Sequence, residues 1–326
     1  MTVGTWCAIL DLFTKKYNDT DKERNGETME TVLQVKGLSK QYKKGIYASH
    51  NVTFDVGKGE IFALIGPNGA GKTTTIRMIS TLLQATEGDA IVAGHSILTE
   101  PDMVRKSITY LPDEAGAYKT MTGREYLEFM ASIYADNGEQ AYEFVKRGCE
   151  ICELGDRLND KISNYSRGMA RKLLLARAIM PLPALAILDE PTSGLDIINA
   201  LEIRRMIRNL ASEGMSFLLS SHNMLEIEYV SDRVGIIAKG ELLEVGKPAE
   251  LIEKYGAQNL EEVFERVVLD REVLLSFPQG IKGNAQPANY YNNDSHSSGA
   301  CYGRSGNVRG NKRQCRKGFR PYYLRP

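Results

Sequence analysis

Short apolar runs and amphipathic stretches alternate between residues 30 and 270 of this 326-residue chain. Ile61–Ile65 is a continuous apolar run of strand length, which predicts a strand buried on both faces, and Ala184–Leu188 and Ser216–Ser220 are two similar runs. The first run leads through a glycine-rich segment into Thr74–Leu83, which has helical periodicity. This order of strand, loop and helix predicts an α/β fold with a mostly parallel sheet.

The remaining periodicity divides the chain further. Between Met121 and Met180 it is almost wholly helical, which predicts a helical insertion near residues 114–180. In residues 31–60 and 91–110, apolar and polar residues alternate more regularly, which predicts an additional β region. Residues 247–276 are interpreted as a C-terminal helical extension, and the absence of internal repeats indicates one copy of one module.

Both ends differ from this central part in composition and in the pattern of apolar residues. Residues 1–28 are polar and patternless, and Met29, directly before the first strand-like segment, is a candidate start site. Residues 277–326 are rich in Gly, Asn, Ser, Tyr and Arg without periodicity, which predicts a disordered tail. Two interpretations stay open, namely segments foreign to the natural fold and ordinary disordered extensions.

Composition and charge narrow the possible classes of protein. Apolar residues make up 42% and charged residues 25%, as in globular proteins. No apolar run approaches the roughly 20 residues that a spanning helix needs, so we expect any membrane role to depend on a partner. The tail 277–326 holds nine basic residues and one acidic residue, which leaves 32 basic and 40 acidic residues in 1–276. This mildly acidic body argues against nucleic acid as the main partner.

The five cysteines are an odd number, thinly spread over a long chain, which favours a reducing compartment. Cys149 and Cys152 have the spacing of a metal or redox site. They also fall within Ala141–Leu154, a predicted helix, where such a pair fills a core face. We favour the core interpretation because no second pair stands nearby.

The glycine-rich segment matches the phosphate-loop pattern G-x-x-x-x-G-K-[ST]. Glycines let backbone N–H groups wrap closely around phosphate oxygens, and the following helix adds its positive dipole end. The pattern assigns the β- and γ-phosphates to the lysine and a Mg²⁺ ligand to the threonine hydroxyl. The ATP-binding residues predicted in this way are Gly66, Pro67, Asn68, Gly69, Ala70, Gly71, Lys72, Thr73 and Thr74.

A second apolar strand, Leu185–Leu188, ends in the carboxylates of Asp189 and Glu190. Consecutive residues of a strand point to opposite sides, so the two carboxylates should have separate tasks. We expect Asp189 to hold the Mg²⁺ and its water shell, and Glu190 to polarise the attacking water. A solvated strand end would explain the pair on its own, but the phosphate loop makes the catalytic interpretation stronger.

From about Thr31 to Gly246 the chain resembles the nucleotide-binding domains of the ABC family, because these motifs follow in that family's order. The segment Pro-Thr-Ser-Gly-Leu-Asp196 after Glu190 resembles the D-loop. His222, which follows an apolar strand 32 residues after Glu190, resembles the switch histidine that senses the γ-phosphate.

Three further positions carry the resemblance. Tyr-Ser166-Arg-Gly168-Met169 resembles the ABC signature, whose Ser166 and Gly168 would contact a nucleotide held by the opposite subunit. Tyr42 resembles the aromatic residue that stacks on adenine, although a surface tyrosine is the alternative. Asp113 stands where the family has the Q-loop glutamine, and its shorter, charged side chain suits metal contact while leaving the coupling geometry open.

The resemblance implies a P-loop NTPase fold with a RecA-like core, an antiparallel β subdomain and a helical subdomain, spanning residues 30–246. It further implies ATP and Mg²⁺ as cofactors, a homo- or heterodimer of ATPase domains, a separate integral membrane permease as partner, and a place on the cytoplasmic face of the cell membrane. Tyr118–Gly123 and Asn259–Phe264 resemble the stand-alone ATPases of ABC-2-type exporters. The alternatives are a soluble ABC ATPase acting on nucleic acid or ribosomes, and a non-catalytic regulatory subunit.

Overall fold

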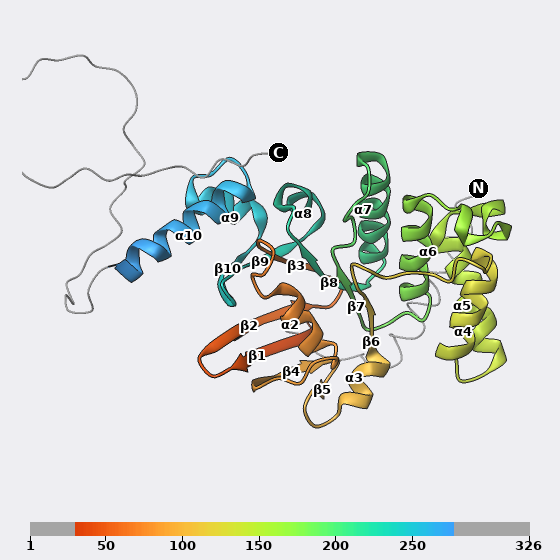
Figure 1. Cartoon of the computed structure of the whole chain (residues 1–326), viewed down its shortest axis with the longest axis horizontal. Helices are drawn as coiled ribbons and strands as arrows, with labels where there is room; N and C mark the ends of the chain where they lie inside the picture. Colours follow the sequence, from red (N-terminus) through yellow and green to blue (C-terminus); the bar gives the residue numbers. More distant parts are fainter. Residues whose placement is uncertain (1–29, 277–326) are drawn as a thin grey trace, which may run out of the picture. The chain divides into compact units, whose positions relative to one another are not determined.

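The computed structural model describes residues 30–276. The extension 1–28, the candidate start Met29 and the tail 277–326 therefore lie outside the described residues. The described part holds two sheets, one of four strands in the order β2-β1-β4-β5 and one of six strands in the order β10-β9-β3-β8-β7-β6 (Figure 1).

The six-stranded sheet is the parallel core that the apolar runs predict. All of its neighbouring strands pair in parallel except β10, which pairs antiparallel with β9. The three expected strands are β3, β7 and β8, and every residue of each is buried. The bounds are β3 Ile61–Ile65, β6 Ile108–Leu111, β7 Leu185–Asp189, β8 Ser216–Ser221, β9 Arg233–Ala238 and β10 Glu241–Gly246.

The four-stranded sheet is antiparallel throughout. It consists of β1 Thr31–Lys43, β2 Ile46–Gly57, β4 Glu87–Val92 and β5 His95–Ser96. The expected β region at 91–110 is wrong in its second half, because Pro101–Ser107 is helix α3 and Ile108–Leu111 joins the parallel sheet beside β7. Alternation within a four-residue strand does not identify its partner, and Pro101 at the first turn favours a helix that starts there.

Strand β3 separates two hydrophobic cores. Ile61, Ala63 and Ile65 face one core, which also contains residues from the helical insertion and from the helices after β7. Phe62 and Leu64 face the other core, shared with the antiparallel sheet and α2 (Lys72–Ile79). The rings of Phe54 and Phe62 stack with centroids 4.8 Å apart, which joins the two sheets. This arrangement explains why the run 61–65 contains no polar residue.

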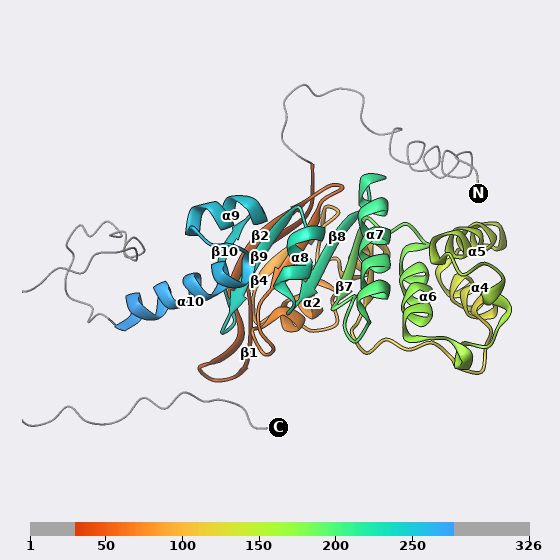
Figure 2. The ribbon, with the colours of Figure 1, turned by 90° about the horizontal axis from the view of Figure 1, so that it is seen from above.

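The helical insertion lies between β6 and β7 in the sequence. Its helices α4, α5 and α6 lie side by side in both views (Figures 1 and 2). Helix α4 begins with a capping box in which Thr122 and Glu125 bond each other's backbone N–H groups. The bounds are α4 Gly123–Tyr134, α5 Gly138–Cys152, α6 Arg167–Ile179, and the 3₁₀ turns Gly155–Asn159 and Ile162–Asn164.

Cys149 and Cys152 lie in α5, the first half-buried and the second buried. Burial raises the pKa of the Cys152 thiol to about 11, so it stays protonated at neutral pH and is a poor nucleophile or metal ligand. Within residues 30–276 no group of three or more His, Cys, Asp or Glu side chains forms a metal-binding cluster. The structure thus supports the interpretation that the pair fills a core face.

Four helices complete the described residues, namely α7 Ile197–Ser212, α8 Met224–Val230, α9 Pro248–Tyr255 and α10 Leu260–Ser276. Leu260, Val263 and Val267 of α10 are buried, and the Glu228 carboxylate of α8 accepts a hydrogen bond from the Leu260 N–H at 3.1 Å. Among all helices of residues 30–276, none combines the length and the apolar character needed to cross a membrane.

Candidate functional site

The phosphate loop connects β3 to α2, as its sequence predicts. Two of its glycines are required by close backbone contacts. Gly66 (φ 158°) has no room for a Cβ, which would lie 2.1 Å from the Ile237 carbonyl oxygen of β9. At Gly71 (φ 107°) a Cβ would lie 2.5 Å from the Ala48 carbonyl oxygen of β2. The loop is therefore held between the two sheets in a conformation that favours glycine.

Lys72 begins helix α2, and its side chain is 6% exposed. Its ammonium group donates hydrogen bonds to the carbonyls of Gly66 at 2.7 Å and Pro67 at 3.2 Å, and lies 3.7 Å from a Glu190 carboxylate oxygen. Burial lowers the pKa of Lys72, and the negative charges of Glu190 and Asp189 oppose this shift. The cation is thus held by the loop and by the acidic pair at the end of β7.

The Asp189 carboxylate accepts hydrogen bonds from three hydroxyl groups. Thr73 Oγ1 lies 3.4 Å from Oδ1, Tyr110 Oη lies 3.3 Å from Oδ2, and Ser220 Oγ also donates to Oδ1. Burial, followed by the nearby Asp189 charge, raises the pKa of Tyr110, which keeps its hydroxyl a donor. Thr73 and Asp189 together supply the oxygen ligands that Mg²⁺ prefers.

The Glu190 carboxylate contacts two other side chains, Lys72 and His222. Its backbone is in the left-handed region (φ 50°), and its N–H donates to the Ser220 carbonyl at 3.1 Å. One carboxylate oxygen faces Lys72, and the other lies 2.9 Å from His222 Nδ1. The two carboxylates therefore contact different groups, but β7 ends at Asp189, so the left-handed backbone of Glu190 separates them and not strand alternation.

A cavity of about 370 Å³ lies over the phosphate loop. It is lined by Ala48, Asn68, Gly69, Ala70, Gly71, Lys72, Thr73, Thr74, Asp113, Asp189 and Glu190. Gly66 and Pro67 do not line the cavity, but their carbonyls accept hydrogen bonds from Lys72, and His222 lies beside the Glu190 carboxylate. The structure thus brings together the predicted phosphate-loop residues, the acidic pair, the histidine and Asp113.

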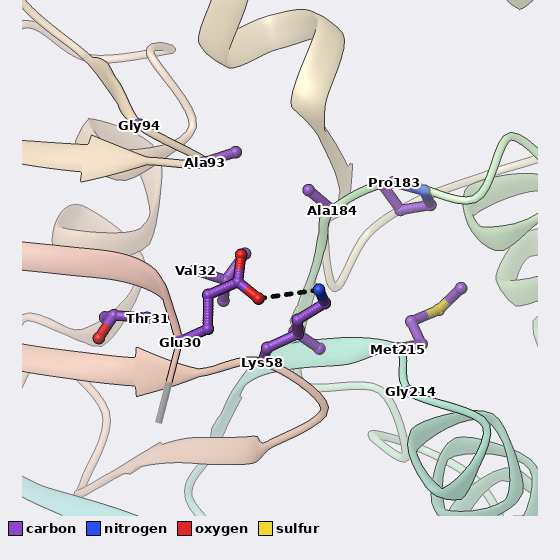
Figure 3. A pocket seen from close by; sticks show the side chains of 11 residues that line it. Glu30, Thr31, Val32, Lys58, Ala93, Gly94, Pro183, Ala184, Gly214 and Met215 are labelled. Atoms are coloured by element: carbon purple, nitrogen blue, oxygen red, sulfur yellow. Dashed lines mark hydrogen bonds and ion pairs between the residues drawn. The ribbon is translucent and has the colours of Figure 1, made fainter. Parts of the chain in front are cut away.

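A second cavity, of about 400 Å³, is shown in Figure 3. The Glu30–Lys58 ion pair of 2.9 Å lines it, and so do Ala184 and Met215, which directly precede β7 and β8. It therefore lies at the amino ends of these strands. Ligands of parallel α/β sheets bind at the carboxyl ends, where the phosphate loop and the acidic pair lie.

Tyr42 and the signature residues do not line the phosphate-loop cavity. Tyr42 is 61% exposed in β1, with the Lys40 ammonium 5.7 Å from its ring centroid. Ser166 caps α6 by accepting a hydrogen bond from the Met169 N–H at 3.2 Å. Gly168 packs against Asn199 so closely that a Cβ would lie 1.8 Å from its Oδ1.

Asp196, the predicted D-loop residue, likewise does not line the cavity. It caps α7 by accepting a hydrogen bond from the Asn199 N–H at 3.0 Å, and these local bonds lower the pKa of its carboxylate. Asp196 therefore holds the start of the helix that covers Gly168.

Sequence reasoning missed several residues that contact this site. Tyr110 and Ser220 are the second-last residues of β6 and β8, the strands on either side of β7, and the strand order that brings them to Asp189 was not predictable from local pattern. Arg171 was missed as well, although a charged residue within the apolar pattern of α6 is a signal. Its guanidinium donates to backbone carbonyls around Glu190.

A phosphate loop between a buried strand and a helix, opposite a carboxylate pair on a second strand of the same sheet, defines the class of P-loop NTPases. The predicted fold class is thereby confirmed, with its parallel core, antiparallel sheet and helical insertion.

Comparisons with known proteins define the family. The family model described as ABC transporter matches residues 49–193. The chain is similar to the linearmycin resistance ATP-binding protein LnrL of Bacillus subtilis (strain 168), with 37% identity over 232 residues covering 70% of this chain and 73% of that protein. It is also similar to the daunorubicin/doxorubicin resistance ATP-binding protein DrrA of Streptomyces peucetius, with 35% identity over 231 residues covering 70% of this chain and 69% of that protein.

One solved structure, described as the ATP-binding subunit of an ABC transporter, is similar with a TM-score of 0.64 and 29% identity, over 73% of this chain and 100% of that chain. The chain therefore belongs to the ABC transporter ATP-binding family, as the order of its motifs indicates. It binds ATP and is an ATPase of this family.

Proposed function

We propose that this chain drives export of a substrate through a separate integral membrane permease, bound to the cytoplasmic face of the cell membrane. The observation that carries the proposal is the single cavity in which Lys72, Asp189 and Glu190 meet. A non-catalytic regulatory subunit would not need all three.

The chemistry follows from the groups around this cavity. The phosphate-loop N–H groups and Lys72 hold the β- and γ-phosphates, while Thr73 and Asp189 hold Mg²⁺, which neutralises charge on the phosphate oxygens when bound. Glu190 orients a water molecule for attack on the γ-phosphorus and accepts its proton, as the bond to the ADP oxygen breaks. His222, 2.9 Å from the other Glu190 oxygen, holds that carboxylate and senses the γ-phosphate.

Two copies of the ATPase domain are needed for a complete site. In one chain Ser166, Gly168 and Met169 do not line the phosphate-loop cavity, so we propose that they complete the site of a second copy or of a related chain. Asp196 would lie at the same interface. Ile197 and Ile198, which follow it, are exposed apolar side chains of the kind that an interface buries. Tyr42 would stack on the adenine ring.

An exposed apolar patch on the helical subdomain supports the proposal that a protein partner binds there. Tyr118, Phe129 and Ile133 are exposed, and the Tyr118 and Phe129 rings meet edge to face with centroids 5.7 Å apart. Exposed aromatic clusters mark protein interaction sites. We propose that the permease binds here and that Asp113 relays nucleotide state to it. The resistance functions in the names of LnrL and DrrA favour export.

Co-purification tests the partner. A tagged full-length chain, extracted from its own cells in mild detergent, should bring down an integral membrane protein, and Phe129→Ser should reduce its recovery. Tyr142→Ser is the matched control, because Tyr142 is also an exposed aromatic residue of the helical subdomain but, within residues 30–276, its ring pairs with neither Tyr118 nor Phe129. Recovery of ribosomes or nucleic acid in place of a membrane protein would refute the proposal.

A further inference from the structure

Arg171 is a buried arginine with no role in the chemistry described above. It lies on α6, five residues after the signature serine, and is 7% exposed. Within residues 30–276 its guanidinium bonds are to backbone carbonyls and not to carboxylates. The acceptors are the carbonyls of Pro191 at 2.7 Å, Asp113 at 3.2 Å, Asp189 at 3.5 Å, and Glu190.

Three of these carbonyls are consecutive and belong to the peptide units around Glu190. That residue has a left-handed backbone (φ 50°), which costs a non-glycine residue about 1 kcal/mol or more unless its surroundings hold it. The Ser220 carbonyl accepts a hydrogen bond from the Glu190 N–H, and the Arg171 guanidinium donates one to the Glu190 carbonyl. A planar guanidinium offers five N–H donors in a fixed fork, so it can fix several carbonyls at once.

Burying this cation costs free energy. Burial lowers the pKa of Arg171, and the negative charges of Asp113, Asp189 and Glu190 partly raise it again. Arg147 provides a comparison within the same chain. It is 8% exposed, burial lowers its pKa, and it donates to the Met180 carbonyl at the end of α6. Both arginines are buried and donate to backbone carbonyls, but Arg147 bonds that of Met180, whereas Arg171 bonds the segment that carries Glu190.

We infer that Arg171 is a positioning residue, which aims the Glu190 carboxylate by fixing the peptide units on both of its sides. The same guanidinium also bonds the Asp113 carbonyl and belongs to α6, the helix that begins at the predicted signature residues. It therefore fixes the positions of Asp113 and of α6 relative to Glu190. The inference rests on the role proposed for Glu190.

The test compares Arg171→Met with Arg147→Met in the full-length chain. Both variants should melt at lower temperature, because each removes a donor to backbone carbonyls, that of Met180 for Arg147 and four for Arg171. Arg171→Met should lower kcat for ATP by about 100-fold with KM nearly unchanged, since a misplacement of about 1 Å has that effect on a catalytic group. Arg147→Met should keep the parental kcat per folded molecule. Arg171→Lys, which keeps the charge without the fork, should restore kcat only in part.

Parental kcat in Arg171→Met, or an equal loss in both methionine variants, would overturn the inference. If Arg171→Met does not fold, Arg171→Lys and Arg147→Lys give the same comparison. Glu190→Gln separates this inference from the proposed catalysis. If Glu190→Gln hydrolyses ATP at the parental rate, the role of Glu190 is refuted and the inference falls with it. An inactive Glu190→Gln beside a fully active Arg171→Met refutes the inference alone.

Discussion

Replacing Glu190 with glutamine removes one negative charge and almost no volume. The side chain keeps hydrogen-bonding capacity toward His222 at 2.9 Å, but it loses the carboxylate that, in the proposed mechanism, accepts the proton of the attacking water. General-base catalysis contributes about 10²- to 10⁴-fold, so the hydrolysis rate should fall by that factor, or about 2.7–5.4 kcal/mol of transition-state stabilisation. ATP affinity should change little, because the phosphate cradle is built from Gly66, Lys72 and the intervening backbone.

The same variant should accumulate as a dimer, because in the proposed function ATP joins two copies and hydrolysis releases them. Size-exclusion chromatography with and without Mg-ATP, at high protein concentration, measures the dimer, and phosphate release measures the rate. Adding Ser166→Arg should abolish the dimer and leave ATP binding to the monomer unchanged. Hydrolysis by Glu190→Gln at the parental rate would refute the assignment of Glu190 as the base.

Three further substitutions or conditions test other parts of the structure. Asp113→Gln should keep hydrolysis within about tenfold, the effect of one water-mediated contact, and a loss of about a hundredfold in an ATPase assay would contradict this. Deleting residues 277–326 should leave folding and ATPase activity intact, because the buried residues of α10 precede the cut; an insoluble truncated protein would show otherwise. Raising the pH from about 9 toward 11 should lower the free energy of unfolding by up to ~2.7 kcal/mol through Cys152. The pKa of its thiol is raised from 9.0 to about 11 in the folded chain, so the unfolded chain loses this proton first. Urea titrations should show a shallower pH dependence for Cys152→Ala, and an unchanged slope would disprove that contribution.

The sequence predicts the strands and the phosphate loop because their signals are local. Ile61–Ile65 is apolar at every position because β3 separates two cores, and the glycines that follow are required by contacts at 66 and 71. The acidic pair could be predicted for the same reason, since its two carboxylates come directly after the apolar residues of β7. These features depend on residues that are close in sequence.

Contacts between distant segments were not predictable in this way. Ile108–Leu111 was expected with the antiparallel strands, and only the observed register with β7 shows its true partner. Tyr110 and Ser220 reach Asp189 through strand order, and Arg171 reaches Glu190 through the packing of α6 on the sheet. No local pattern specifies which carbonyl a buried arginine will bind.

The packing of Gly168 against Asn199 changes how substitutions in the signature segment should be interpreted. A methyl group at 168 would displace an amide whose Nδ2 donates to Asp196, so the damage would spread to the cap of α7 within one chain. A defect in Gly168→Ala would therefore report on a broken helix start as well as on a loss of the proposed nucleotide contact between subunits. A substitution at Ser166, whose hydroxyl caps only its own helix α6, would leave the start of α7 intact.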